Sequence, residues 1–205
     1  MRTQHLAKLT AILPALAAGS QLAQGTFIYD QQSSTNETPA NFGSGGDLML
    51  NPPAQSFTPL LDSVGFIRLN FDDGNPGDGL GATVYVNLRA GSVTGTILGT
   101  SDSVTMRDGF AGVTNFLFPT PVSVSSGTTY FFEPVQSAGG NWNIEVGPYL
   151  YPGGILYVNG MPTPGADLWF REGIIPEPPS LCLVLIGGVM VVGAKFRAAG
   201  RSVRN

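Results

Sequence analysis

Residues 82–90 carry the clearest alternation of apolar and polar side chains in the chain. Five apolar residues from Ala82 to Ala90 occupy one phase, and threonine, tyrosine, asparagine and arginine occupy the other. Successive side chains of an extended strand point to opposite faces, so a period of two predicts a strand with one buried face. The stretch therefore predicts a β-strand that borders a hydrophobic core.

Short apolar segments separated by turn sequences continue this pattern. The segment 63–71 predicts another strand, and its apolar phase slips between Phe66 and Ile67, which indicates a β-bulge there. Because alternating faces favour antiparallel sheets, we expect an all-β domain, an antiparallel β-sandwich that is jelly-roll-like. Further strands are expected at 96–100, 113–118, 128–135, 142–146, 155–158 and 166–171, with turn sequences rich in glycine, proline and asparagine between them.

The two ends of the chain have a different character. Arg2 and Lys8 precede a short apolar run, 9–18, that small residues follow, which predicts an N-terminal signal peptide. Near the other end, the uncharged apolar run 181–194 predicts a C-terminal transmembrane helix at the short end of what can cross a bilayer. The basic residues that follow it, from Lys195 onward, would stay in the cytoplasm, which places the preceding domain outside.

The sequence Ile175-Pro176-Glu177-Pro178, followed by Pro179-Ser180, precedes this apolar run and its basic tail. Motif, apolar run and basic tail together closely resemble the PEP-CTERM sorting signal of Gram-negative bacteria. The resemblance implies recognition of Pro176, Glu177 and Pro178 by an exosortase, a membrane cysteine protease, with processing near these residues. It also implies a setting of exopolysaccharide and biofilm formation. The alternative is an ordinary C-terminal anchor after a proline-rich spacer.

These signals divide the chain into four parts. They are a signal peptide (1–25), a polar, loop-rich lead-in (26–55), the β-sandwich domain (56–173) and the sorting signal (174–205). Such a chain would use the Sec translocon, signal peptidase and then exosortase. We expect export, a transient anchor in the inner membrane, and a final place at the cell surface or outside the cell.

Charge is distributed unevenly along the chain, whose formal net charge is −4. The region between the two ends holds thirteen of the fourteen acidic residues but only four of the ten basic ones. Such a surface repels phosphate backbones, which argues against a nucleic-acid partner.

The region between the ends contains no histidine, cysteine or lysine. This excludes Ser-His-Asp and Cys-His catalysis, lysine nucleophiles and typical zinc sites there. Carboxylate chemistry, as in glycoside hydrolysis, would have to use Glu133, Glu145 or Asp167. Glu145 lies in the polar phase of its strand, where a solvated carboxylate is expected. We therefore expect a protein that is not an enzyme and that uses no cofactor.

One loop gathers oxygen-bearing side chains at Asp72, Asp73, Asn75 and Asp78 among several glycines. Hard cations such as calcium prefer these ligands, although the spacing differs from that of an EF-hand loop. The same residue types also form solvated turns between two strands. Both interpretations, the turn and the calcium site, stay open.

Aromatic residues are concentrated in the last third of the chain. Trp142 shares the phase of its apolar neighbours, which predicts a core position, whereas Trp169 shares the phase of Asp167 and Arg171 and is expected to face outward. With Tyr149 and Tyr151 it forms a candidate carbohydrate-binding surface. Two hypotheses follow: a structural or adhesive surface protein, or a module that binds an exopolysaccharide through these three rings.

Overall fold

The folded part of the chain consists of antiparallel β-sheets. The computed structural model describes residues 26–36 and 46–176, and no segment within these ranges is helical. The prediction of an all-β, antiparallel fold is confirmed, and the arrangement is that of a β-sandwich.

A six-stranded sheet has the order β1-β15-β4-β10-β2, with β8 paired to the other edge of β4. Its strands are β1 (Ile28–Gln32), β2 (Gly46–Asp47), β4 (Ser63–Asp73), β8 (Ala111–Ser123), β10 (Trp142–Ile144) and β15 (Phe170–Ile174).

A seven-stranded sheet has the order β13-β12-β3-β9-β5-β6, with β7 also paired to β5. Its strands are β3 (Pro53–Phe57), β5 (Ala82–Ala90), β6 (Ile97–Thr100), β7 (Val104–Met106), β9 (Tyr130–Gly139), β12 (Leu156–Val158) and β13 (Met161–Thr163). A separate short pair joins β11 (Val146–Gly147) to β14 (Asp167–Leu168).

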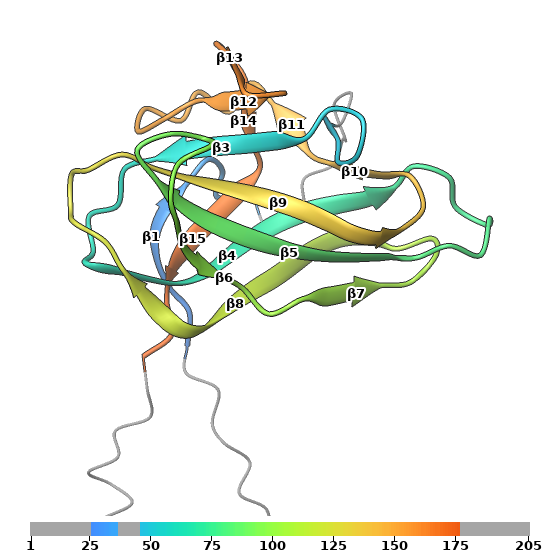
Figure 1. The fold of residues 1–205 in the computed structure, drawn as a ribbon, viewed down its shortest axis with the longest axis horizontal. Coiled ribbons are helices and arrows are strands. Elements are labelled where there is room, and N and C mark those ends of the chain that lie inside the picture. Colours follow the sequence, from blue (N-terminus) through green and yellow to red (C-terminus); the bar gives the residue numbers. More distant parts are fainter. Residues whose placement is uncertain (1–25, 37–45, 177–205) are drawn as a thin grey trace, which may run out of the picture. The chain divides into compact units, whose positions relative to one another are not determined.

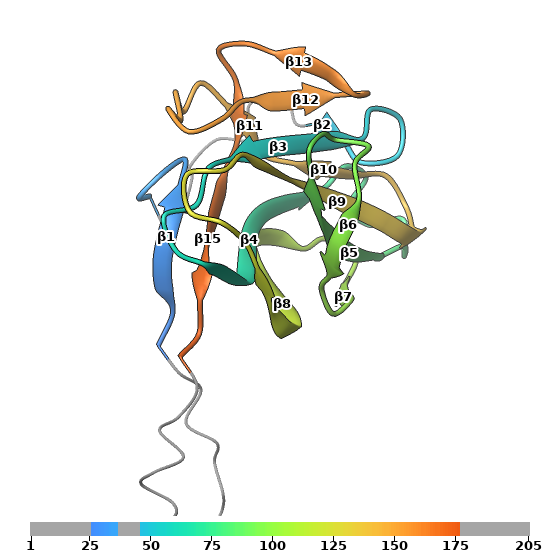
Figure 2. The ribbon, with the colours of Figure 1, turned by 60° about the vertical axis from the view of Figure 1, so that its left-hand side comes forward.

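Successive long strands of the chain alternate between the two sheets. Strands β3, β5 and β9 belong to the seven-stranded sheet, whereas β4, β8 and β15 belong to the six-stranded one. Figure 1 shows β5 and β9 in front of β4 and β15, and the turned view of Figure 2 separates the layers. Each sheet can therefore turn an apolar face toward the other.

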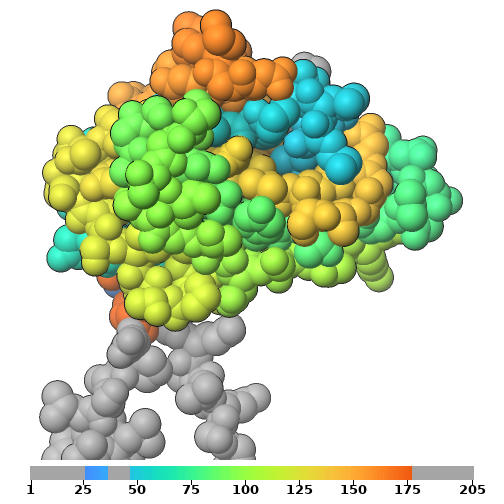
Figure 3. Space-filling model, viewed as in Figure 1, coloured from blue at the N-terminus to red at the C-terminus, as the bar shows by residue number. Residues whose placement is uncertain are grey.

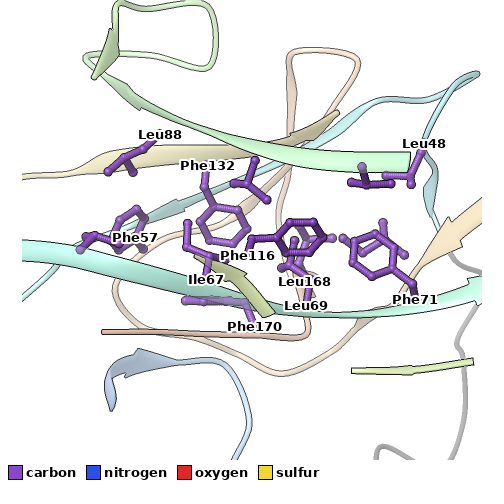
Figure 4. Packing of buried hydrophobic residues seen from close by; sticks show 14 of the residues in the cluster. Leu48, Phe57, Ile67, Leu69, Phe71, Leu88, Phe116, Phe132, Leu168 and Phe170 are labelled. Carbon is purple, nitrogen blue, oxygen red and sulfur yellow. The ribbon is translucent and has the colours of Figure 1, made fainter. Parts of the chain in front are cut away.

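The hydrophobic core lies between these two layers. The Phe132 ring of β9 and the Phe170 ring of β15 come from different sheets, and their centroids are 5.2 Å apart. The apolar phase of β5, which includes Val84, Val86 and Leu88, is fully buried in the same cluster. Figure 4 shows side chains of both sheets interleaved. Because the unit from Thr26 onward has its own continuous core, we expect it to fold without the chain ends.

The bulge expected in β4 is present, one position earlier than predicted. The register with β8 shifts between Val64 and Phe66 rather than between Phe66 and Ile67. Because of this shift, Val64 and Ile67 both reach the core. Phe66 is also fully buried, but on the opposite face, where it lies edge-on to Phe27 at 4.6 Å between centroids. The phase slip in the sequence thus reflects burial on both faces of one strand.

The segment 26–55, for which a polar, loop-rich lead-in was predicted, supplies β1, β2 and the first part of β3. β1 pairs with β15, so that Ile28 lies opposite Ile174, and β3 pairs with β9. The strand β1 has no signal in the sequence, because its residues are mostly polar and few of them face the core. Figures 1 and 2 show β1 and β15 side by side. The start of β1 and the end of β15 therefore lie next to each other.

Several predicted features lie outside the described residues. They are the signal peptide (1–25), the motif residues Glu177 and Pro178, and the transmembrane helix expected at 181–194. Within 26–36 and 46–176, the chain forms no helix of the length and apolar character needed to cross a membrane.

Candidate functional site

The tryptophan of the predicted carbohydrate-binding surface is enclosed by the protein. Trp169 is 0% exposed, so the expectation that its ring is accessible from outside is wrong. Its indole Nε1 donates a hydrogen bond to the Asn36 carbonyl at 3.1 Å, and the Arg171 guanidinium lies 5.5 Å from the ring centroid. The alternation correctly placed Trp169 away from the core, but chain segment 33–36 covers that face. An enclosed ring cannot stack on a sugar.

The two tyrosines of that surface are held by internal hydrogen bonds. Tyr151 is 7% exposed, and its hydroxyl donates to Gln31 Oε1 at 2.9 Å. Burial raises the pKa of Tyr151 to about 12. Tyr149 is half-buried and donates its hydroxyl proton to Glu145, and burial followed by this carboxylate raises its pKa. The structure therefore does not bring Tyr149, Tyr151 and Trp169 together as an exposed aromatic surface.

Glu145 is buried at 1% exposure, contrary to the solvated position that its phase predicted. Asn70 Nδ2 donates to one carboxylate oxygen and Tyr149 donates to the other. The remaining two candidate carboxylates are also engaged, in different surroundings. Asp167 accepts hydrogen bonds from Gln55 and from the Tyr151 N–H, whereas Glu133 pairs with Arg89.

The acidic loop forms turns by accepting backbone hydrogen bonds. Asp73 accepts from the Asn75 N–H at 2.9 Å and from the Gly109 N–H at 2.8 Å, while Asp78 accepts from the Leu80 N–H at 2.7 Å. The side chain of Asn75 donates to Asp78 at 3.1 Å. These bonds favour the turn interpretation, because they occupy the carboxylate oxygens of Asp73 and Asp78 that a cation would need.

Asp108, in the turn before β8, also binds this loop, and the sequence did not predict its role. Its two oxygens accept from the N–H groups of Gly77 and Gly79, which lowers its pKa. Partial burial, followed by the charge of Asp73, raises the pKa of Asp72. Over the described ranges, no group of three or more His, Cys, Asp or Glu side chains is arranged to hold a metal ion.

A ladder of arginines and aromatic rings covers the outer face of the six-stranded sheet. Arg68 lies 5.7 Å from the ring centroids of both Phe27 and Tyr29, and Arg171 lies 5.1 Å from that of Tyr29. Such cation–π contacts stabilise a buried guanidinium. The ladder joins residues from β1, β4 and β15, so no local sequence pattern could have indicated it. These cation–π contacts hold Phe27 and Tyr29 of the N-terminal segment against the sheet.

A buried carboxyl lies where β1 meets β15. Glu172 is 0% exposed, and burial followed by the charge of Asp30 raises its pKa to about 9. Asp30 accepts hydrogen bonds from the N–H groups of Leu60 and Leu61 at 2.8 and 2.9 Å, which fixes the position of its carboxylate. Glu172 is therefore protonated at neutral pH.

The outer face of the seven-stranded sheet carries a second group of aromatic and polar side chains, here called the tyrosine face. Arg89 on β5 donates to Glu133 on β9 through Nε and through a terminal nitrogen, at 2.9 and 2.8 Å. Next to them, the rings of Phe131 and Tyr157 meet edge-on with centroids 5.6 Å apart. The tyrosine face consists of Tyr85, Asn87, Arg89, Phe131, Glu133 and Tyr157.

No protein-family model matches this chain, and no curated protein matches it.

Proposed function

We propose that the chain is an exported, exosortase-processed protein of the bacterial cell surface or extracellular matrix, with a structural or adhesive β-sandwich domain that is not catalytic. The observation that carries the proposal is the C-terminal sequence, in which Pro176-Glu177-Pro178 precedes an uncharged apolar run and a basic tail. The match to the PEP-CTERM pattern includes the order and the spacing of all three parts.

The position of the motif relative to the folded unit supports this proposal. Strand β15 ends at Ile174, two residues before Pro176, and β1 begins at Ile28, shortly after the expected signal peptide. Because Ile28 and Ile174 are paired, both processed ends would leave the domain at one place.

The chemistry of the domain supports a role without catalysis. Residues 26–176 contain no histidine, cysteine or lysine. The three candidate carboxylates Glu133, Glu145 and Asp167 each bind side chains of the protein itself, whereas glycoside hydrolysis requires two carboxyl groups directed at a substrate. We also propose that the sandwich is of the jelly-roll type, because its long strands alternate between the sheets.

The test is to express the full chain in a bacterium that contains an exosortase. The wild-type chain is expected to appear outside the cytoplasm at a reduced mass. Replacing Glu177 with Ala should leave a longer, membrane-bound form, whereas replacing the nearby Ser180 with Ala should leave processing unchanged. Processing of the Glu177→Ala chain at the same place as wild type, or no C-terminal processing of either chain, would overturn the proposal of exosortase processing.

A further inference from the structure

The two tyrosines of the tyrosine face differ from the other four in the protein. The hydroxyls of Tyr29, Tyr130, Tyr149 and Tyr151 all form hydrogen bonds within the domain. Those of Tyr85 and Tyr157 form none with the described residues, and both rings are half-buried rather than enclosed. A half-buried tyrosine with an unused hydroxyl offers an apolar surface and a hydrogen-bonding group together.

The charged pair between these tyrosines also keeps unused hydrogen-bonding capacity. Arg89 uses three of its five N–H donors, two on Glu133 Oε2 and one on the Gly95 carbonyl at 2.9 Å. The second carboxylate oxygen of Glu133, Oε1, has no partner among the described residues, and the two side chains are 18% and 25% exposed. The pair therefore presents fixed donors and a fixed acceptor, while its charges offset each other.

Strand geometry places these groups in a row across the sheet. Tyr85 and Arg89 are four residues apart on β5, which corresponds to about 14 Å along the strand. Arg89 lies opposite Phe131, whose ring is 7% exposed and supports the half-buried ring of Tyr157. The row thus has an aromatic ring near each end and polar groups between them, over a length that accommodates several sugar rings.

Two loops border one end of this row. The turn between β12 and β13 approaches the β5–β6 loop, since a Cβ at Gly160 would lie 4.0 Å from Val93 Cγ2. Figure 3 shows the β5–β6 loop, in green, directly below the orange β12–β13 hairpin. The hydroxyl of Thr100 donates to Asn87 Oδ1 at 2.8 Å, which fixes the amide within the face. The side chains of Asn87, Arg89 and Glu133 are therefore held in position before any ligand binds.

We propose that the tyrosine face binds a neutral polysaccharide. Flat aromatic rings stack on the C–H faces of sugars, and planar guanidinium, carboxylate and amide groups match pairs of sugar hydroxyls. A neutral rather than an acidic chain is favoured, because residues 26–176 hold thirteen acidic residues and four arginines and would repel a polyanion. This binding site is independent of how the chain is sorted, and it differs from the three rings predicted from the sequence.

The experiment is native affinity electrophoresis of residues 26–176 in gels that contain hydroxyethylcellulose, laminarin, dextran or alginate. We expect retardation by at least one of the three neutral polysaccharides and none by alginate. Replacing both Tyr85 and Tyr157 with Ala should weaken binding about tenfold or more. Tyr157→Phe, which keeps the ring, should retain most of the binding.

Leu98→Ala provides the control, because Leu98 is a 41% exposed apolar residue of the same sheet outside the tyrosine face. Thermal unfolding of each variant verifies that it is folded. The proposal is overturned if no neutral polysaccharide retards the folded protein, if alginate alone does so, or if the double variant binds like Leu98→Ala. Failure of this test would leave the sorting proposal intact, since the tested domain lacks both ends.

Discussion

Replacing Glu172 with Gln is expected to stabilise the domain at neutral pH and to remove much of its pH dependence. The Glu172 carboxyl is fully buried beside Asp30, and its pKa rises from 4.5 to about 9 on folding. In the unfolded chain the same group ionises near pH 4.5. Between these two values, the unfolded chain loses a proton that the folded protein keeps, so raising the pH favours unfolding.

The size of this effect follows from the two pKa values. Below pH 4.5 both states hold the proton, and the group has no effect on the pH dependence. Above it, each pH unit lowers the free energy of unfolding by about 1.4 kcal/mol until the folded carboxyl ionises near pH 9. At pH 7 the accumulated loss is about 3 kcal/mol. Glutamine has nearly the same shape and does not ionise, so the variant should regain most of this free energy.

Urea unfolding of wild type and Glu172→Gln at several pH values from 4.5 to 8 measures the effect. The fluorescence of Trp142 and Trp169 provides the signal, because both are fully buried in the folded state. We expect the two curves to coincide near pH 4.5 and to diverge as pH rises. Asp102→Asn, at an exposed carboxylate, is the control and should follow wild type. Parallel curves for wild type and Glu172→Gln would refute the reasoning.

Two further changes test the core and the acidic loop. Phe132→Ala removes a fully buried ring that contacts Phe170 across the sheets, and it should lower the free energy of unfolding by about 3–5 kcal/mol in urea titrations. Leu150→Ala, at a 74% exposed side chain, should change it by less than about 0.5 kcal/mol, and equal effects would contradict the described core. Asp73→Ala leaves the Asn75 and Gly109 N–H groups without their acceptor and should cost about 1–3 kcal/mol. In thermal unfolding, calcium should not raise the melting temperature of wild type, and a rise would restore the calcium interpretation.

The sequence predicted those parts of the fold that depend on one buried face. The alternation at 82–90 corresponds residue for residue to β5, because that strand has the core on one side and a partly exposed surface on the other. β4 was harder to read, since Phe66 and Ile67 are buried on opposite faces. β1 was missed because its residues are mostly polar and it is held by pairing with β15, which lies far away in the sequence.

The candidate site was predicted less well, for a related physical reason. Periodicity indicates toward which face a side chain points, but it does not indicate whether another segment covers that face. Trp169 and Glu145 point away from the core, as predicted, yet both are buried by neighbouring segments. The tyrosine face depends on residues from β5, β9 and β12 that only the sheet order brings together. The polar phase of β5, with Tyr85 and Arg89, was the one local signal for it.

The most direct test of the proposed sorting is the mass of the mature protein from its own cells. Intact-mass analysis after fractionation would give both ends of the chain at once. We predict a protein outside the cytoplasm that begins near Thr26 and ends near the Pro176-Glu177-Pro178 motif, without the apolar run and basic tail. A cytoplasmic protein that keeps residues 1–25 and the residues after Pro178 would contradict the proposal.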